Sequence, residues 1–173
     1  MDKPNLKTIE NFVSNSDELF LCLRDSVKWD ERMKARKTAS FGVSYDYSGI
    51  AYPEIPMKDE LVYICKKIEK ELGFFPNNCL MNYYPDGDSS MGYHSDSSEE
   101  LCPGTGVAII SLGAERHINY KLKSNNEIVI RHKLLRGMLL YMDIAVQEKW
   151  LHAIPKEPGT DQRISLTFRK IIK

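Results

Sequence analysis

The sequence predicts an α+β protein in which two helices come first and a sandwich or jelly roll of strands follows. Apolar residues recur at four-residue spacing in two stretches of the first half of the chain. From Cys79 onward, short apolar runs alternate with turn residues at regular intervals, as in antiparallel β proteins. The chain has 173 residues, of which 42% are hydrophobic and 28% charged, and this suits one globular domain.

The first helix is predicted to begin at Ser16, which would cap it, with Asp17 and Glu18 in the first turn. An apolar face follows at four-residue spacing. The second helix is predicted to begin near Pro56 and to end at Gly73, because glycine readily adopts the left-handed conformation that ends a helix. The apolar faces of the two helices comprise Leu19, Leu23 and Val27 in the first, and Leu61, Ile64, Ile68 and Leu72 in the second.

A stretch of alternating aromatic and polar residues separates the two helices. Phe41–Ser48 has the period of a strand, and Gly42 and Gly49 can form turns. This stretch is predicted to be a strand pair or a lid.

The second half of the chain is predicted to contain at least six strands. Turn residues such as Asp86-Gly87-Asp88 and Glu157-Pro158-Gly159 separate them. The predicted strands lie near Cys79–Tyr84, Gly106–Leu112, Arg116–Lys121, Glu127–Arg131, Gly137–Met142 and Arg163–Arg169. Helices followed by regularly spaced strands favour a fold of packed β layers.

The charges balance, since Lys plus Arg and Asp plus Glu each count 24. Any binding of nucleic acid must therefore come from local basic stretches, at 28–37 and 116–136, which are equally typical of solvated surface. The four cysteines include no Cys-x-x-Cys pair, and no signal peptide is found at the amino end. No apolar stretch approaches the ~20 residues of a membrane span. The expected location is cytoplasmic, with no membrane association and no evident obligate protein partner.

The triplet His94-Ser95-Asp96 is the most informative motif in the chain. Residues i and i+2 of a strand point to the same side, so the imidazole and the carboxylate can meet one metal ion. His152 is the candidate third ligand. Two histidines and one carboxylate leave positions open on the metal, which is the site type of non-haem Fe(II) oxygenases. The alternative is a chance occurrence on a surface loop, with Asp96 solvated.

The last predicted strand carries a second signal. Its polar row contains Arg163, Ser165, Thr167 and Arg169, and its other face is apolar. Two arginines that face inward need an anionic partner, and the carboxylates of a small diacid suit the guanidinium fork. The alternative is an edge strand with its arginines in water.

Four motifs in this order resemble the AlkB family of Fe(II)- and 2-oxoglutarate-dependent dioxygenases, which demethylate nucleobases. They are Asn82-Tyr83-Tyr84-Pro85, His94-Ser95-Asp96, His152, and Arg163 followed by Leu166-Thr167-Phe168-Arg169. The resemblance extends from about residue 34 to 171. It implies a double-stranded β-helix (jelly-roll) core with two flanking N-terminal helices and a nucleotide-recognition lid. One domain would span 1–173, with the lid at about 28–55 and the catalytic jelly roll at about 79–171.

The resemblance also implies a role for each motif residue. His94, Asp96 and His152 would bind Fe(II) and form the catalytic centre, with 2-oxoglutarate and O₂ as cosubstrates. Arg169 would hold the distal carboxylate of 2-oxoglutarate, and Arg163 would stand near the end that chelates the metal. Asn82 and Tyr84 would add hydrogen bonds to the cosubstrate, although Tyr84 also suits an ordinary core position. Ser165 occupies the place where the family commonly has asparagine.

The lid would recognise the substrate base. Tyr47 is the candidate for stacking on a flipped-out base, with Tyr45 near the sugar-phosphate. Arg36, Ser48 and Ser98 are the further candidates for substrate contact. Ser98 stands two positions after Asp96, where the family often has an acidic residue that reads the base. The alternative is a hairpin whose tyrosines simply cover the sheet.

The implied reaction is oxidative demethylation of N-alkylated bases in DNA or RNA, with release of formaldehyde, succinate and CO₂. The chain is compact, so single strands are favoured over duplex as the nucleic-acid partner. The first alternative is the same chemistry on a protein side chain, a small metabolite or a nucleoside. The second is a jelly-roll module that binds a ligand without catalysis.

Overall fold

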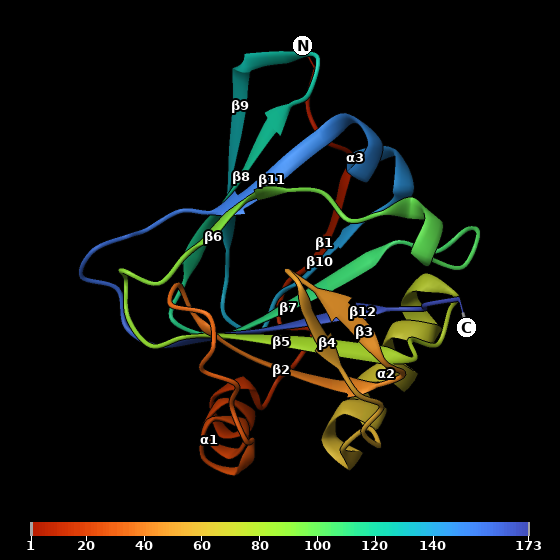
Figure 1. The fold of residues 1–173 in the computed structure, drawn as a ribbon, viewed down its shortest axis with the longest axis vertical. Coiled ribbons are helices and arrows are strands. Elements are labelled where there is room, and N and C mark those ends of the chain that lie inside the picture. The colour runs from red at the N-terminus through yellow and green to blue at the C-terminus, as the bar shows by residue number, and fades with distance from the viewer. Residues whose placement is uncertain (1, 173) are drawn as a thin grey trace.

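The computed structural model describes residues 2–172 and contains two main antiparallel sheets that face each other (Figure 1). The larger sheet has the strand order β1-β10-β7-β12-β5-β2 and the smaller one β6-β11-β8-β9. The larger sheet contains β1 (Leu6–Ile9), β2 (Lys37–Gly42), β5 (Asn78–Tyr84), β7 (Val107–Gly113), β10 (Leu139–Met142) and β12 (Arg163–Arg169). The smaller contains β6 (Met91–His94), β8 (Arg116–Leu122), β9 (Asn125–Leu134) and β11 (Trp150–Ile154).

The helices lie where the four-residue spacing places them. Helix α1 (Ser16–Ser26) and helix α2 (Asp59–Leu72) lie against the larger sheet on the side away from the smaller one (Figure 1). Helix α2 ends at Gly73, whose φ of 82° is left-handed as predicted. Two boundaries differ from the prediction, because the N-cap of α1 is Asn15 rather than Ser16 and α2 begins at Asp59 rather than near Pro56.

The alternation along β12 divides the hydrophobic core into two layers. Ile164, Leu166 and Phe168 pack against the helices, in one cluster with Leu23, Ile68 and the other apolar residues of their inner faces. The opposite row of β12 faces the space between the sheets, where a second apolar cluster includes Ile109, Tyr120 and Trp150. This strand pairs with β5 on one side and β7 on the other, so the edge-strand alternative is wrong.

The stretch predicted as a strand pair or lid forms a short hairpin. Strand β3 (Tyr45–Tyr47) pairs with β4 (Ile50–Tyr52), and the hairpin lies in front of the larger sheet (Figure 1). Its turn contains Ser48 and Gly49, both with positive φ. The preceding residues belong to β2 of the larger sheet.

Several short elements have no counterpart in the prediction. They are β1, β6, β11, the 3-10 turn η1 (Ser98–Glu100) and helix α3 (Ile144–Lys149). A helix of six residues is too short to show a 3.6-residue period, and a strand of four residues shows little alternation. None of the helices in the described part of the chain is long and apolar enough to cross a membrane.

Candidate active site between the two sheets

The three candidate metal ligands come from the adjacent strands β6 and β11. These strands are antiparallel and pair His94 with His152, so that the centroids of the two imidazole rings lie 4.4 Å apart. Asp96 follows β6 by two residues, and its side chain is only 6% exposed. This arrangement agrees with the prediction that the three side chains lie on one face. It does not agree with the alternative in which Asp96 is a solvated residue of a surface loop.

Both the carboxylate and the buried imidazole have the protonation state that a metal ligand needs. Burial alone would raise the pKa of Asp96, but Arg169, His152 and His94 together hold this pKa below its usual value. Burial, and after it the neighbouring His94, lowers the pKa of His152 to about 3, so the imidazole is neutral with a free lone pair. Its Nδ1 has no partner among the described residues. Ionised carboxylate and neutral imidazole are the forms that bind divalent metals.

The ligand side chains are not gathered into a finished metal cluster. Within residues 2–172, no group of three His, Cys, Asp or Glu side chains stands in an arrangement that could hold a metal ion. The carboxylate of Asp96 accepts a hydrogen bond from Arg169, with 3.1 Å between Oδ2 and Nη2. The donor types, their burial and the unpartnered imidazole nitrogen fit Fe(II), and the carboxylate must leave or share Arg169 to bind it.

The inner row of β12 supplies a buried cationic pocket beside these ligands. Arg163 and Arg169 are 1% and 3% exposed, and Nε and Nη1 of each have no partner among the described residues. Arg163 donates from Nη2 to Ser111 Oγ at 3.0 Å. Buried guanidinium nitrogens without acceptors indicate an anionic ligand, and a dicarboxylate such as 2-oxoglutarate fits. The same cavity is lined by Asn82, Tyr84, Ser165, Thr167, His94, Asp96 and His152.

The two arginines lie at opposite ends of the inner row of β12. Arg169, predicted at the distal carboxylate, is the one that contacts Asp96. Arg163, predicted near the metal end, has its guanidinium 5.1 Å from the centroid of the Tyr84 ring. The two side chains are six residues apart on one strand and therefore point to the same face. The alternation of residues along β12 does not show which end of the strand lies nearer the candidate metal ligands.

The hairpin places two tyrosines over this pocket. Tyr45 and Tyr47 are both buried, and the Tyr45 ring centroid lies 4.9 Å from the Arg169 guanidinium. The Tyr47 hydroxyl accepts a hydrogen bond from Arg36 and donates one to Met91 Sδ at 3.4 Å. Burial raises the pKa of Tyr45 to about 12 and also raises the pKa of Tyr47, so both hydroxyls stay protonated.

Of the other substrate candidates, Arg36 and Ser48 line the mouth of the site and Ser98 does not. Arg36 is buried, and its Nε donates to Asn82 Oδ1 at 2.8 Å, so it joins the hairpin to the lining of the cationic pocket. Ser48 is exposed at the hairpin turn. Ser98 lies in η1 outside the mouth, and Ser97 lines the mouth in its place.

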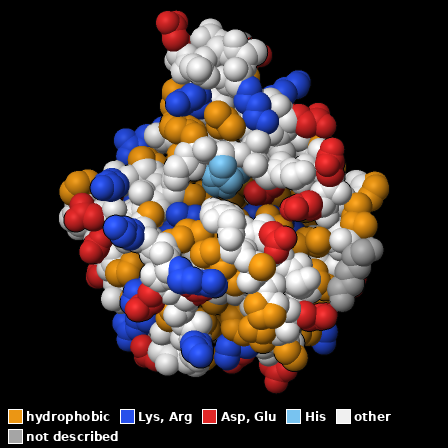
Figure 2. Space-filling view, in the orientation of Figure 1, with side chains coloured by type: hydrophobic (Ala, Val, Ile, Leu, Met, Phe, Trp, Pro, Cys, Tyr) orange, Lys and Arg blue, Asp and Glu red, His pale blue; other side chains and the backbone are white. Residues whose placement is uncertain are grey.

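The mouth of the site is a hollow of about 400 Å³ between the hairpin and β6. It is lined by residues 45–48 and 91–97 together with Arg36. On the face of the molecule shown in Figure 2, Lys and Arg side chains are interspersed with Asp and Glu side chains. The surface around the site is therefore mixed in charge, not uniformly basic.

Helix α3 contributes a residue that the sequence reasoning missed. Gln147 is 1% exposed, and its Oε1 accepts the backbone N–H of Asp96 at 2.8 Å. This hydrogen bond fixes the backbone that carries the carboxylate. No sequence signal identifies Gln147, because α3 is too short for a periodic pattern and the contact spans 51 residues.

The chain is similar in sequence to known Fe(II) oxygenases. The sequence model of the 2OG-Fe(II) oxygenase superfamily matches residues 9–169. Human "DNA oxidative demethylase ALKBH2" is 32% identical over 148 residues, which cover 79% of this chain and 57% of that protein. Rat "Alpha-ketoglutarate-dependent dioxygenase alkB homolog 3" is 29% identical, covering 92% and 61% respectively. The chain thus spans somewhat more than half the length of these curated relatives.

Two further similarities cover more of the matched protein. The uncharacterized protein R406 of Acanthamoeba polyphaga mimivirus is 30% identical over 156 residues, which cover 89% of this chain and 81% of that protein. Among solved structures, "The structure of OsALKBH1" matches 98% of this chain and all of that chain, with a TM-score of 0.71 and 16% identity. This structural similarity supports the jelly-roll oxygenase fold.

Proposed function

Because the chain belongs to the AlkB family of 2OG-Fe(II) oxygenases and is a dioxygenase, we propose that it oxidatively demethylates N-alkylated nucleobases in DNA or RNA. The products would be the repaired base, formaldehyde, succinate and CO₂. Single-stranded nucleic acid is the proposed partner. One domain would span 1–173, with the lid at about 28–55 and the catalytic jelly roll at about 79–171.

The observation that carries the proposal is the buried pair of arginines beside the His94, Asp96 and His152 side chains. Four guanidinium nitrogens without acceptors suit the carboxylates of 2-oxoglutarate. Fe(II) would be held by His94, Asp96 and His152, and with O₂ and 2-oxoglutarate it supplies oxidation of a C–H bond. A ligand-binding module without catalysis has no need for a neutral buried imidazole next to an ionised carboxylate.

The residues of the chain would bind, orient and shield the reactants. Arg169 would meet the cosubstrate carboxylate nearest the metal, and Arg163 the distal one, with Asn82, Tyr84 and Ser165 completing the pocket. Two guanidinium groups at opposite ends of a small diacid fix both its position and its direction. The inner face of the larger sheet would exclude water from the reaction.

The hairpin would act as the lid that receives the base. The base would enter the hollow between β3 and β6, with Tyr47 on one side and His94 on the other. Stacking on an aromatic ring contributes about 1–3 kcal/mol per base and would offset part of the unstacking of the target nucleotide. Arg36 joins Tyr47 to Asn82, so it would keep the lid in register with the cosubstrate pocket.

Mixed charge around the mouth favours a second candidate, the same oxidation of a protein side chain or a small metabolite. The test is mass spectrometry of single-stranded DNA and RNA carrying 1-methyladenine or 3-methylcytosine, incubated with the protein, Fe(II), 2-oxoglutarate and ascorbate. The proposal predicts that the oligonucleotide loses the mass of one CH₂ and that this loss requires 2-oxoglutarate. The mass decrease should be absent with Asp96→Ala and present with the matched control His132→Ala. Succinate formation without any change in the oligonucleotides would favour the second candidate.

A further inference from the structure

Arg116, at the start of β8, is a fully buried arginine outside the cosubstrate pocket, and none of the motifs above includes it. Its side chain is 0% exposed, although a guanidinium keeps its charge in proteins. A buried charge is retained only where fixed partners replace water. The partners of Arg116 therefore indicate what it does.

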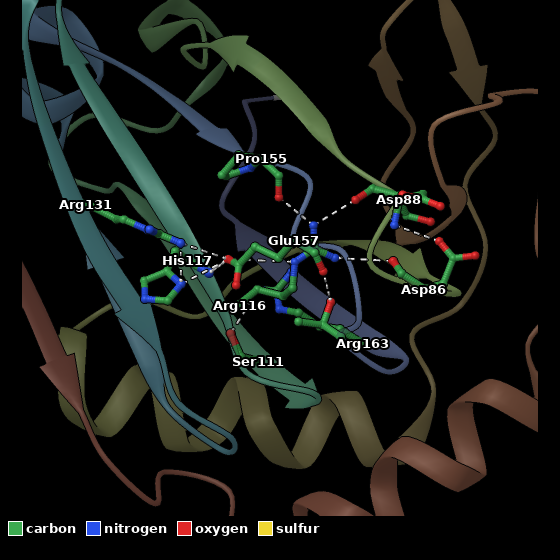
Figure 3. Close-up of polar contacts among 11 residues, drawn as sticks. Asp86, Asp88, Ser111, Arg116, His117, Arg131, Pro155, Glu157 and Arg163 are labelled. Atoms are coloured by element: carbon green, nitrogen blue, oxygen red, sulfur yellow. Dashed lines mark hydrogen bonds and ion pairs between the residues drawn. The ribbon is translucent and has the colours of Figure 1, made fainter.

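Its hydrogen-bond partners are three backbone carbonyl groups on two different loops (Figure 3), and its guanidinium also lies 5.4 Å from the centroid of the Tyr84 ring. Nη2 donates to the carbonyl oxygen of Ser89 at 2.8 Å and to that of Pro155 at 2.6 Å, and Nη1 lies 3.4 Å from that of Asp86. Asp86 lies just after β5, Ser89 just before β6, and Pro155 directly after β11. One guanidinium thus joins the ends of the strands that carry Tyr84, His94 and His152.

These are the strand ends that most need an external tie. Strand β6 has only four residues, and its pairing with β11 is irregular between His152 and Ile154. A short strand with an interrupted ladder has a weakly specified register. A shift of one residue would turn His94 away from His152, because neighbouring side chains of a strand point to opposite faces.

The loops joined by Arg116 are also packed directly on each other. The Glu157 N–H donates to the Gly87 carbonyl oxygen at 2.9 Å, and a Cβ at Gly87 would come within 2.0 Å of the Glu157 carbonyl oxygen. Glu157 Oε1 lies 4.0 Å from Arg116 Nε and accepts the His117 N–H at 2.7 Å (Figure 3). Glu157 therefore balances the buried charge and anchors its loop to β8.

We infer that Arg116 is a positioning residue for the metal ligands. It binds the carbonyl groups of Asp86, Ser89 and Pro155 and thereby fixes the register of β6 against β11. This register determines how closely His94 approaches His152. Arg116 touches neither metal nor substrate. This inference rests on the metal site of the proposed function, and it predicts that metal affinity depends on the guanidinium fork, not on positive charge alone.

The test is titration of Co(II) into the full chain without 2-oxoglutarate, followed by calorimetry and by visible absorption. Arg116→Lys keeps the charge but cannot reach the same three carbonyls with a rigid fork. Arg116→Lys and Arg116→Met are each expected to weaken Co(II) binding by about tenfold, the lower end of the effect of losing a direct partner of a metal ligand, because Arg116 acts through the loops and not on the ligands themselves; the absorption bands should also change. Arg131→Met is the matched control, because Arg131 is 57% exposed and lies 3.8 Å from the same Glu157 carboxylate.

A second control separates positioning from general destabilisation. Ile68→Val removes one methylene from the buried face of helix α2, in the core between the helices and the larger sheet. It should lower the melting temperature without changing the affinity for Co(II) or the visible spectrum. If Arg116→Met does not fold, Arg116→Lys decides. The inference would be overturned if every Arg116 variant that folds bound Co(II) with wild-type affinity. Failure of the wild type itself to bind Co(II) would instead refute the metal site of the proposed function.

Discussion

The hydrogen bond between Gln147 and the backbone of Asp96 leads to a quantitative prediction. Gln147→Met keeps the approximate shape of the side chain but removes the amide oxygen that accepts the Asp96 N–H at 2.8 Å. A buried N–H left without an acceptor costs about 1–3 kcal/mol. For a domain of this size, 1 kcal/mol corresponds to about 2–4 °C in melting temperature, so a fall of about 2–12 °C is expected.

The same change should weaken the metal site. The hydrogen bond fixes the backbone from which the Asp96 carboxylate extends, and loss of such an orienting partner usually weakens metal binding by about 10–100-fold. The assay is calorimetric titration with Co(II) at a temperature well below the melting transition, so that only folded protein is measured.

Glu148→Met is the matched control, because Glu148 is an exposed neighbour on the same helix. It should melt and bind Co(II) like the wild type. Wild-type Co(II) affinity in Gln147→Met would refute the reasoning, whatever the melting temperature.

Three further predictions address the cosubstrate, the lid and the pH dependence of stability. Arg163→Met should raise the 2-oxoglutarate concentration needed for half-maximal succinate formation by about 30-fold or more. The reason is that breaking a buried charge pair costs about 2–5 kcal/mol. An unchanged 2-oxoglutarate requirement would mean that the cosubstrate binds elsewhere. Tyr47→Ala should weaken demethylation but leave uncoupled succinate formation, whereas Tyr47→Phe, which keeps the ring and loses only the hydroxyl contacts with Arg36 and Met91, should weaken demethylation less than Tyr47→Ala does; loss of both activities in Tyr47→Ala would indicate a structural tyrosine. Burial would raise the pKa of Glu157, but hydrogen bonds from His117 and the charge of Arg116 lower this pKa below its usual value. The ionised carboxylate therefore stabilises the fold at neutral pH, and this stabilisation is lost as the pH falls through the lowered pKa. Urea unfolding should show that Glu157→Gln is less stable than the wild type at neutral pH, and that this difference becomes smaller below about pH 4.

The sequence predicted β12 and α2 well because their periodicity is strong, whereas β9 (Asn125–Leu134) is longer than the predicted Glu127–Arg131. Strand β12 has the predicted bounds, since its polar and apolar residues alternate without interruption over seven positions. Helix α2 ends at the predicted glycine. Strands β6 and β11 were missed because each is short and does not follow a simple alternation of polar and apolar residues. Strand β6 carries His94, and β11 carries Trp150 and His152.

The candidate site was predictable as a set of residue types but not as an arrangement. His94, Asp96 and His152 are distinctive in sequence, whereas the order of Arg163 and Arg169 relative to the metal depends on how β12 lies in the sheet. Gln147 and Arg116 escaped prediction for a physical reason: they act on backbone N–H and carbonyl groups, which every residue has, and so no motif marks the pair.

In the proposed active site, His94, Asp96 and His152 together hold one metal ion. Equilibrium dialysis against Co(II), with metal content measured by atomic emission, tests this claim most directly. The wild type and His132→Ala should each retain a single ion per chain, and Asp96→Ala and His152→Ala should retain none while still folding. Equal metal content in all four proteins would contradict the claim, because the bound metal would then lie somewhere other than between β6 and β11.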